Sequence, residues 1–206
     1  MKKLIINNCM NLVNKYSPDL NKKQIDTIRY GLEGLYLSIT KLIIIFIISL
    51  ILKIQKEFLM LIIIFNIIRL FGFGVHAKRS IDCLISSSIF FIGFPILCKY
   101  MILPSIIKII LFVPLIILIS IYAPADTEKR PLKNKKKRIM YKILTIIVAT
   151  IYIILSITIK DNTLSNCFLV ATIIETIIIL PLTYKIFKVP YNNYKKYFFI
   201  VIYRMC

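Results

Sequence analysis

Long apolar runs separated by short polar stretches are the feature that most limits how this chain can fold. The run from Leu42 to Leu52 is interrupted only at Ser49, and the run from Phe58 to Ile68 only at Asn66. A third run covers residues 106–121 with three interruptions. Runs of this length and spacing indicate helices that cross a membrane. Since 59% of the 206 residues are hydrophobic, above the usual soluble-domain range of about 45–50%, we expect an all-α polytopic membrane protein.

The apolar segments predict about six transmembrane helices. The expected spans are Leu35–Leu52, Phe58–Phe71, Ile81–Cys98, Met101–Tyr122, Ile139–Ile159 and Cys167–Tyr184. The second is short for a hydrocarbon core of about 30 Å, and so we expect it to tilt or to run into irregular structure.

An amphipathic helix is expected before the first span. Ser17-Pro18-Asp19 predicts a helix start with Ser17 as the N-cap, and Ile25, Ile28 and Leu32 then recur at helical spacing. We expect three regions: a cytosolic or interfacial segment (1–34), a transmembrane domain (35–184) and a basic cytoplasmic tail (185–206). A short soluble helix packed on the rest is the alternative for the first region.

The placement of positive charge predicts the topology. The chain has 28 Lys and Arg residues against 9 Asp and Glu, a net charge of +19. With the N-terminus inside, 21 of the 28 fall in the four inner segments, 1–34, 72–80, 123–138 with Lys142, and 185–206, and four fall in outer loops. Because inner loops are enriched in Lys and Arg, we expect both termini to be cytoplasmic at a cell membrane, and we exclude nucleic acid as the partner.

The cysteines and the single histidine limit the chemistry. Five cysteines at irregular spacing argue against a disulfide framework. One histidine with scattered cysteines supplies fewer ligands than the four of a closed structural zinc site. We therefore expect no metal and no cofactor.

The segment from Arg69 to Cys83 contains the candidate chemistry. Two of the five glycines, Gly72 and Gly74, stand just before the only histidine, His76. A neighbouring imidazole can convert a thiol to the nucleophilic thiolate, so His76 and Cys83 are a candidate base and nucleophile. On one helix they would lie about 10.5 Å apart along the axis, too far for contact. We therefore expect His76 in a loop and Cys83 in the first turns of the third span. Taken alone, an inert buried Cys and a solvated His are the simpler interpretations.

The order of motifs resembles the AgrB family, membrane endopeptidases that process the peptide precursor of a bacterial quorum-sensing signal. The specific match is Arg69, Gly74, His76, Ala77 and Cys83. Further matches are Tyr122-Ala-Pro-Ala with the basic residues up to Pro131, and Ile174-Glu175 through Leu180-Pro181. The similarity covers about residues 30–185. One departure is Phe73, where the family often has glycine.

The resemblance implies a cysteine peptidase in which His76 and Cys83 form the catalytic dyad, with Arg69 and Gly74 in support. Cys83 would attack a peptide bond and hold the N-terminal part of the precursor as a thioester. A thiol of the precursor would then close a thiolactone ring, the autoinducing peptide. The implied partners are a small precursor with an amphipathic leader, a central Cys and an acidic tail, together with the lipid bilayer, and a homodimer is compatible with this interpretation.

The basic loop from Asp126 to Arg138 is a candidate substrate-binding surface. It has seven positive and two negative residues. An acidic substrate tail could bind Lys129, Arg130, Lys133, Lys135, Lys136 and Lys137. A topology anchor, or a site for anionic lipid, is the simpler interpretation.

Four other polar residues have candidate roles. Arg69 could orient the loop, bind a carboxylate or extend into water, and Asp82 and Asp126 could orient the imidazole. Because a charged group in mid-span is expensive, we expect Glu175 to form a structural ion pair, with Lys41, Lys108 or Arg69 as its partner.

Two other functions stay open from the sequence. One is a small multi-pass peptide transporter, with Arg69, Lys108 and Glu175 along a path, and the other is a non-enzymatic membrane partner. A transporter often shows internal repeats, and the sequence contains no convincing repeat.

Overall fold

Helices make up most of the part of the chain that the structure describes. The computed structural model describes residues 2–17, 19–75, 80–127 and 131–194. The elements in order are α1 (Lys2–Tyr16), α2 (Lys22–Ile51), α3 (Gln55–Gly72), α4 (Ser80–Ser88), the π-helix η1 (Ile89–Gly93), α5 (Phe94–Tyr100), α6 (Ser105–Tyr122), α7 (Lys135–Thr158), α8 (Asn162–Ile179) and α9 (Pro181–Ile186).

The predicted class, an all-α multi-pass membrane protein, is confirmed. Among the described residues, five helices are long and apolar enough to cross a membrane: Gln24–Ile51, Asp82–Tyr100, Ser105–Tyr122, Lys135–Thr158 and Asn162–Ile179. The expected short second span corresponds to α3, which has 18 residues and carries Lys56, Glu57 and Arg69. These three charges distinguish it from the five helices above, and α3 is not among them.

The chain divides into two compact units, Met1–Ile48 and Ser49–Cys206. In the first unit, α1 is joined to α2 by an ion pair between Lys2 and Glu33 (2.9 Å) and by a hydrogen bond from Arg29 to Asn7 (3.1 Å). These polar contacts link two helices, of which the sequence had predicted only one.

The predicted helix start at Ser17 is wrong. Helix α2 begins at Lys22, and Asn21 caps it: the Asn21 side chain accepts from the Gln24 N–H (3.0 Å), and the Gln24 side chain accepts from the Asn21 N–H (2.9 Å). This reciprocal capping box satisfies two backbone donors, which explains the later start. From there α2 continues without a break to Ile51, so the amphipathic stretch and the first span are one helix.

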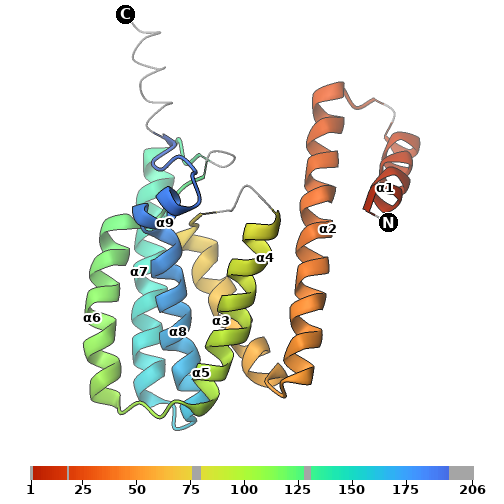
Figure 1. Ribbon diagram of the computed structural model, residues 1–206. Coiled ribbons are helices and arrows are strands. Elements are labelled where there is room, and N and C mark those ends of the chain that lie inside the picture. The colour runs from red at the N-terminus through yellow and green to blue at the C-terminus, as the bar shows by residue number, and fades with distance from the viewer. Residues whose placement is uncertain (1, 18, 76–79, 128–130, 195–206) are drawn as a thin grey trace, which may run out of the picture. The chain divides into compact units, whose positions relative to one another are not determined.

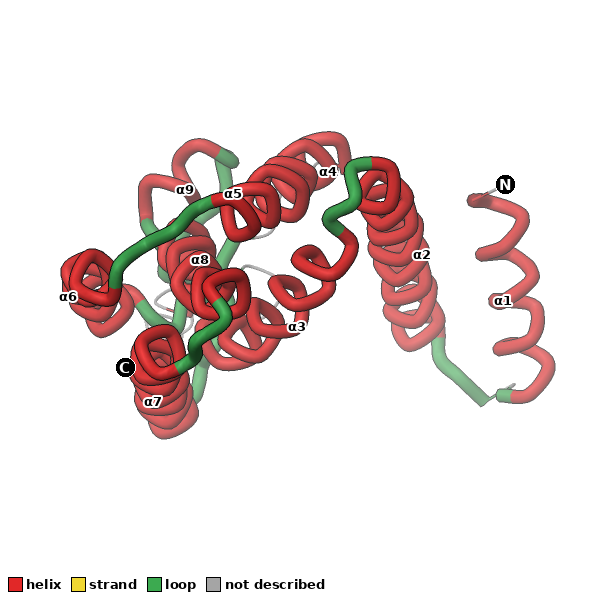
Figure 2. Tube along the Cα trace, turned by 90° about the horizontal axis from the view of Figure 1, so that it is seen from below, coloured by secondary structure: helices red, strands yellow, loops and turns green. Residues whose placement is uncertain are grey.

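Helix α8 lies at the centre of the second unit, and α3, α5, α6 and α7 pack around it (Figures 1 and 2). Its buried positions include several small residues: Ser165, Cys167, Ala171, Thr172 and Thr176. Small side chains let neighbouring helices approach closely, which is how helices associate within a membrane. Outer helices expose apolar rows instead, as on α6 with Ile106, Ile110, Ile117 and Ile121.

The ends of α8 differ from the expected span Cys167–Tyr184. Asp161 caps the helix by accepting from the N–H groups of Thr163 and Leu164, so α8 begins five residues early. At the other end Leu180 leaves the helix, and Pro181 starts the short helix α9. The residue before a proline avoids helical backbone geometry, which accounts for the break.

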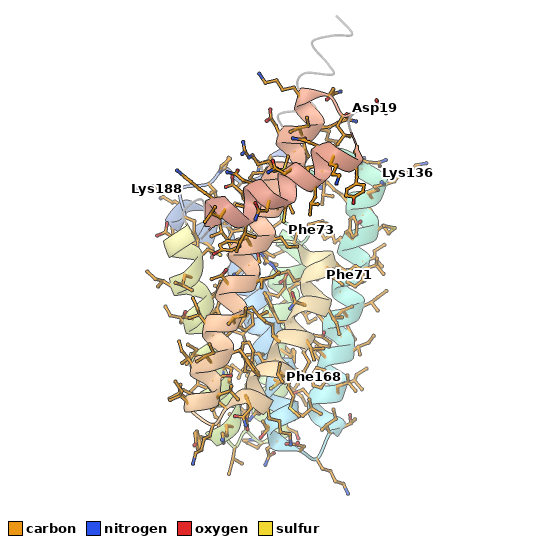
Figure 3. All side chains as sticks on the ribbon, turned by 90° about the vertical axis from the view of Figure 1, so that its right-hand side faces the viewer. Asp19, Phe71, Phe73, Lys136, Phe168 and Lys188 are labelled. Carbon is orange, nitrogen blue, oxygen red and sulfur yellow. The ribbon has the colours of Figure 1, made fainter. Side chains whose placement is uncertain are left out.

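The end of α3, the start of α4, the end of α6, the start of α7 and helix α9 lie at one end of the second unit. Figure 1 shows them at the upper end, with the α2–α3, α5–α6 and α7–α8 connections at the lower end. Figure 3 places Phe73, Lys136 and Lys188 at that upper end and Phe168 further down. We call this end the loop end.

A hydrogen bond inside the bundle gives a stability prediction. The Tyr152 hydroxyl of α7 is buried and donates to the Ile64 carbonyl of α3 (2.6 Å). Tyr152→Phe should lower the free energy of unfolding by about 1 kcal/mol, the usual contribution of such a bond. Denaturant unfolding in detergent measures the loss. Tyr100→Phe, at an exposed position, is the matched control and should change nothing; equal effects in both variants would contradict the assignment.

Candidate functional site

Cys83 lies near the start of α4, at the loop end of the bundle. Its side chain is half-buried, as is that of Asp82. The Ser86 hydroxyl donates to the backbone carbonyls of Asp82 (2.8 Å) and Cys83 (3.2 Å). The position of Cys83 in the first turns of the third span is as predicted. His76 lies outside the described residues, as do Lys129 and Arg130, so the dyad itself stays a prediction.

The backbone that leads to His76 has an unusual conformation. Helix α3 ends at Gly72, and the next two residues have positive φ, 63° at Phe73 and 103° at Gly74. A Cβ at Gly74 would lie 3.0 Å from Arg69 Nη1 and 3.1 Å from the Ile178 carbonyl oxygen. Gly74 is therefore needed for both its conformation and its lack of a side chain.

Backbone hydrogen bonds join this turn to two distant segments. The Gly74 N–H donates to the Ala125 carbonyl (2.9 Å), and the Ala125 N–H donates to the Gly72 carbonyl (3.0 Å). The Val75 N–H donates to the Ile178 carbonyl at the end of α8 (3.0 Å). We call Gly72–Val75 the braced loop, because it is bonded on both sides immediately before His76.

Arg69 braces the same loop from within α3. Its guanidinium donates to the carbonyls of Phe73 (2.8 Å) and Val75 (3.0 Å). Of the three roles considered for Arg69, orientation of the loop is the one that the geometry supports.

Asp126 anchors the segment that begins with Tyr122-Ala-Pro-Ala. Its buried carboxylate accepts three backbone N–H groups, from Leu132 (3.2 Å), Asn193 (3.0 Å) and Tyr194 (2.8 Å). Burial raises the pKa of this carboxyl, and the three hydrogen bonds offset part of that rise. These bonds hold the start of the basic loop to the chain that follows α9, a role that sequence reasoning did not find.

Tyr184 of α9 completes this anchor. Its buried hydroxyl lies 3.0 Å from both the Ala125 and the Asp126 carbonyl oxygens, and it can donate to either. Since Ala125 also bonds the braced loop, a single segment connects α9, the basic loop and the turn before His76. The sequence did not indicate this role for Tyr184, because a Tyr at the end of a span is usually interpreted as an interfacial residue.

The expected ion pair of Glu175 is not formed with any described residue. Both carboxylate oxygens are buried without a hydrogen-bond partner, and the Arg69 donors go to loop carbonyls instead. Lys108 donates to Ser165 in the first turn of α8. Glu175 instead packs on Gly72, where a Cβ would lie 2.0 Å from its Oε1.

The predicted substrate-binding lysines that are described lie at the start of α7. Lys133, Lys135, Lys136 and Lys137 are all exposed, at the loop end of the bundle. Asn134 caps the helix by accepting from the N–H groups of Lys136 and Lys137. Since the first turn of a helix favours negative charge, this cluster does not serve the stability of α7.

Comparison with known proteins agrees with the motifs assembled here. The profile of accessory gene regulator B matches residues 6–179. The chain belongs to the AgrB family.

It is 31% identical over 170 residues to an AgrB-like protein of Clostridium acetobutylicum, and the match covers 82% of this chain and 81% of the relative. An AgrB-like protein of Clostridium beijerinckii is 34% identical over 161 residues (77% and 78%), and one of Listeria innocua 28% over 172 (82% and 83%). No solved structure matches. Family membership places the protein in accessory gene regulation.

The braced loop gives a second prediction. Gly74→Ala places a Cβ against Arg69 and Ile178 on backbone with positive φ, and it should cost about 1–3 kcal/mol of stability. The thermal unfolding midpoint in detergent would report the loss. Gly31→Ala, where a Cβ meets open space within a helix, should be neutral or slightly stabilising. A Gly74→Ala midpoint equal to that of Gly31→Ala would rule out the tight fit.

Proposed function

We propose that this protein is a membrane cysteine endopeptidase that removes the C-terminal part of a small signal-peptide precursor. The supporting observation is the braced loop: a rigid backbone ends at Val75, directly before His76, at the same end of the bundle as Cys83. A general base must be held within hydrogen-bonding reach of the group that it deprotonates. Bracing of this kind is what a base on a short loop requires.

The proposed reaction has two transfer steps. His76 takes the proton of the Cys83 thiol, and the thiolate attacks the carbonyl carbon of the scissile peptide bond. The C–N bond breaks, the amine of the C-terminal fragment leaves with the proton from His76, and the N-terminal part stays on Cys83 as a thioester. The thiol of a precursor cysteine then attacks this thioester. This attack forms the thiolactone and breaks the bond between the acyl carbon and the Cys83 sulfur, which takes up the proton and becomes a thiol again.

The position of Cys83 favours this chemistry. It is the fourth residue of α4, near the N-terminal end of the helix, where the backbone dipole attracts negative charge. The other described cysteines of this unit, Cys98 and Cys167, are buried in the bundle and lack such surroundings.

The positions of the buried charged residues support the transporter alternative less than the peptidase proposal. Lys108 is bonded to Ser165, whereas Glu175 lies ten residues further along α8, about 15 Å away along the helix axis. Each group packs against protein in its own place. A path lined jointly by these residues is therefore not favoured.

We propose that the loop end faces the cytoplasm and that both termini lie on that side. Described basic residues at the loop end are Lys133, Lys135, Lys136, Lys137, Arg138, Lys142, Lys185 and Lys188, whereas the opposite end has Lys53, Lys56, Lys99 and Lys160. An excess of this kind marks the cytoplasmic side of membrane proteins.

We propose that the lysine cluster at the start of α7 captures the acidic tail of the precursor. The four exposed ammonium groups of this cluster lie within five residues of each other and together attract an anionic ligand. An amphipathic leader would meanwhile lie in the membrane interface and bring the precursor to this end of the protein.

The first experiment tests the nucleophile and the side of the membrane. Cys83→Ser should abolish cleavage of a precursor in vesicles, because a hydroxyl is a far weaker nucleophile, and His76→Ala should slow cleavage roughly 10²–10⁴-fold. A membrane-impermeant thiol reagent should modify Cys83 from the cytoplasmic side only.

Cys98→Ser and Cys167→Ser are the matched controls for loss of a thiol and should keep cleavage. The peptidase proposal is wrong if Cys83→Ser, correctly inserted, still processes the precursor. The proposed orientation is wrong if the reagent reaches Cys83 only from outside.

The second experiment tests substrate capture. Replacing Lys133, Lys135, Lys136 and Lys137 by Gln should raise the apparent KM more than it lowers kcat. Each exposed pair contributes only ~0–1 kcal/mol, but several act together on binding. The advantage of the unmodified protein should shrink as salt screens the charges. Gln at Lys53, Lys56, Lys99 and Lys160 is the control. Unchanged KM at low salt in the quadruple variant would leave the cluster with a topological role alone.

A further inference from the structure

The chain that follows α9 folds back on that helix at the loop end of the bundle (Figure 1). The Val189 N–H donates to the Tyr184 carbonyl (3.0 Å), and the Tyr184 and Tyr191 rings meet edge-on with centroids 5.0 Å apart. Asn193 is only 2% exposed, and its side chain donates to the Pro190 carbonyl (2.8 Å). This stretch is therefore a folded part of the second unit.

One carboxyl group binds this stretch and also closes part of the basic loop. Asp126 is 3% exposed, and its Oδ1 accepts from the Asn193 N–H (3.0 Å). Its Oδ2 accepts from two N–H groups, those of Tyr194 (2.8 Å) and Leu132 (3.2 Å). Leu132 lies six residues after Asp126. The same two oxygens therefore hold the chain after α9 and join both ends of the first half of the basic loop.

Tyr194 meets the other end of the basic loop through its ring. The Arg138 guanidinium carbon lies 3.3 Å from the centre of this ring, a cation–π contact. Arg138 is the last residue of the basic loop and belongs to α7. The backbone of Tyr194 is thus bonded to the first residue of the loop, and its side chain contacts the last. We call Asn193 and Tyr194, with their contacts to Asp126 and Arg138, the tail clamp.

The composition of the basic loop gives a reason for such a clamp. Its seven positive charges against two negative ones repel one another and favour an open loop. A loop that is ordered only on binding loses affinity, because the entropy of ordering opposes the association. A loop held at both ends before the ligand arrives avoids most of that cost. The clamp therefore favours binding without any contact of its own with the ligand.

We propose that the tail clamp holds the basic loop in the form that binds an acidic peptide tail, with Asp126 and Tyr194 as its positioning residues. This inference rests on the proposed capture of the precursor by the lysine cluster of the same loop. Asn193 and Tyr194 lie beyond residues 6–179, which the family profile matches, so family membership does not assign them a role.

Binding of a fluorescein-labelled hexaglutamate peptide to the full-length protein in detergent, at low salt, tests the clamp without cleavage. Asp126→Asn leaves one acceptor oxygen where two are used, and we expect Kd to rise about 10-fold because the loop is then ordered only on binding. Tyr194→Leu removes the ring over Arg138 and should raise Kd about threefold. Tyr194→Phe keeps the ring face and should raise Kd less than Tyr194→Leu.

Charge alone predicts the opposite result for both variants. Asp126→Asn removes an acidic group beside the basic loop, and Tyr194→Leu uncovers the Arg138 guanidinium, so each change would strengthen the binding of an anion. Unchanged or tighter binding of the peptide by either folded variant would overturn the clamp. The unfolding midpoint in detergent shows which variants are folded. Should Asp126→Asn not fold, Tyr194→Leu decides, since the Tyr194 side chain is only half-buried.

Two matched controls lie at the opposite end of the bundle. Asp161 also accepts from two backbone N–H groups, those of Thr163 and Leu164, but through Oδ1 alone, which Asp161→Asn retains. Tyr100→Leu removes a ring whose centre lies 5.8 Å from the Lys99 ammonium nitrogen. Both variants should bind the peptide with the Kd of the unmodified protein.

Cleavage kinetics separate this inference from the function on which it rests. In Asp126→Asn we expect KM for the precursor to rise about 10-fold and kcat to change less than about twofold. A lower kcat at unchanged KM would contradict the clamp, because Asp126 would then serve the turn before His76. Cleavage by Cys83→Ser would remove the peptidase and leave the peptide-binding result standing. Failure of the unmodified protein to bind hexaglutamate would remove the clamp and leave the peptidase standing.

Discussion

The close packing of a four-residue loop on the central helix is the constraint on which the rest of the site depends. Gly72 leaves just enough space for the Glu175 carboxyl group, and Gly74 lies against Ile178 and Arg69. Contacts this tight require α8 to be fixed in rotation and depth. Its neighbours on every side, and small residues such as Ala171 and Thr172 that let them approach, supply that rigidity. The geometry before His76 is thus a property of the whole second unit.

Three segments that are far apart in the sequence act as one structure at the loop end. The Gly74 N–H donates to the Ala125 carbonyl, and the Ala125 N–H donates to the Gly72 carbonyl. The Val75 N–H donates to the Ile178 carbonyl, and the Tyr184 hydroxyl donates to the Ala125 carbonyl. Separate motifs of the AgrB family thereby meet at a single place. This explains why a match confined to the His and Cys region would be incomplete: the turn keeps its shape only with the partners that the later motifs supply.

The sequence predicted the features that local patterns encode and missed those that depend on contacts between distant segments. Apolar runs predicted the all-α membrane class, and residue spacing predicted that Cys83 lies in the first turns of the third span. The start of α2 was wrong because Asn21 and Gln24 cap it in preference to Ser17. The mid-span position of Glu175 suggested an ion pair, yet its side chain packs against Gly72. A contact between residues so far apart in the sequence cannot be predicted from hydrophobic periodicity. The dyad itself stays a prediction from residue types and family resemblance.

Phe73 shows that the loop is shaped by its surroundings and not by local preference. An aromatic residue at φ 63° is strained by about 1–3 kcal/mol, and the family often has glycine here. Six hydrogen bonds within the described residues hold the braced loop, each contributing about 1 kcal/mol. Four join backbone groups, including the one from the Phe73 N–H to the Arg69 carbonyl (3.1 Å), and two come from the Arg69 side chain. The Phe73 ring also packs edge-on against Tyr141 of α7, with ring centroids 5.1 Å apart. These interactions together outweigh the strain, so this chain can keep a turn suited to glycine while it uses the side chain to attach the loop to a further helix.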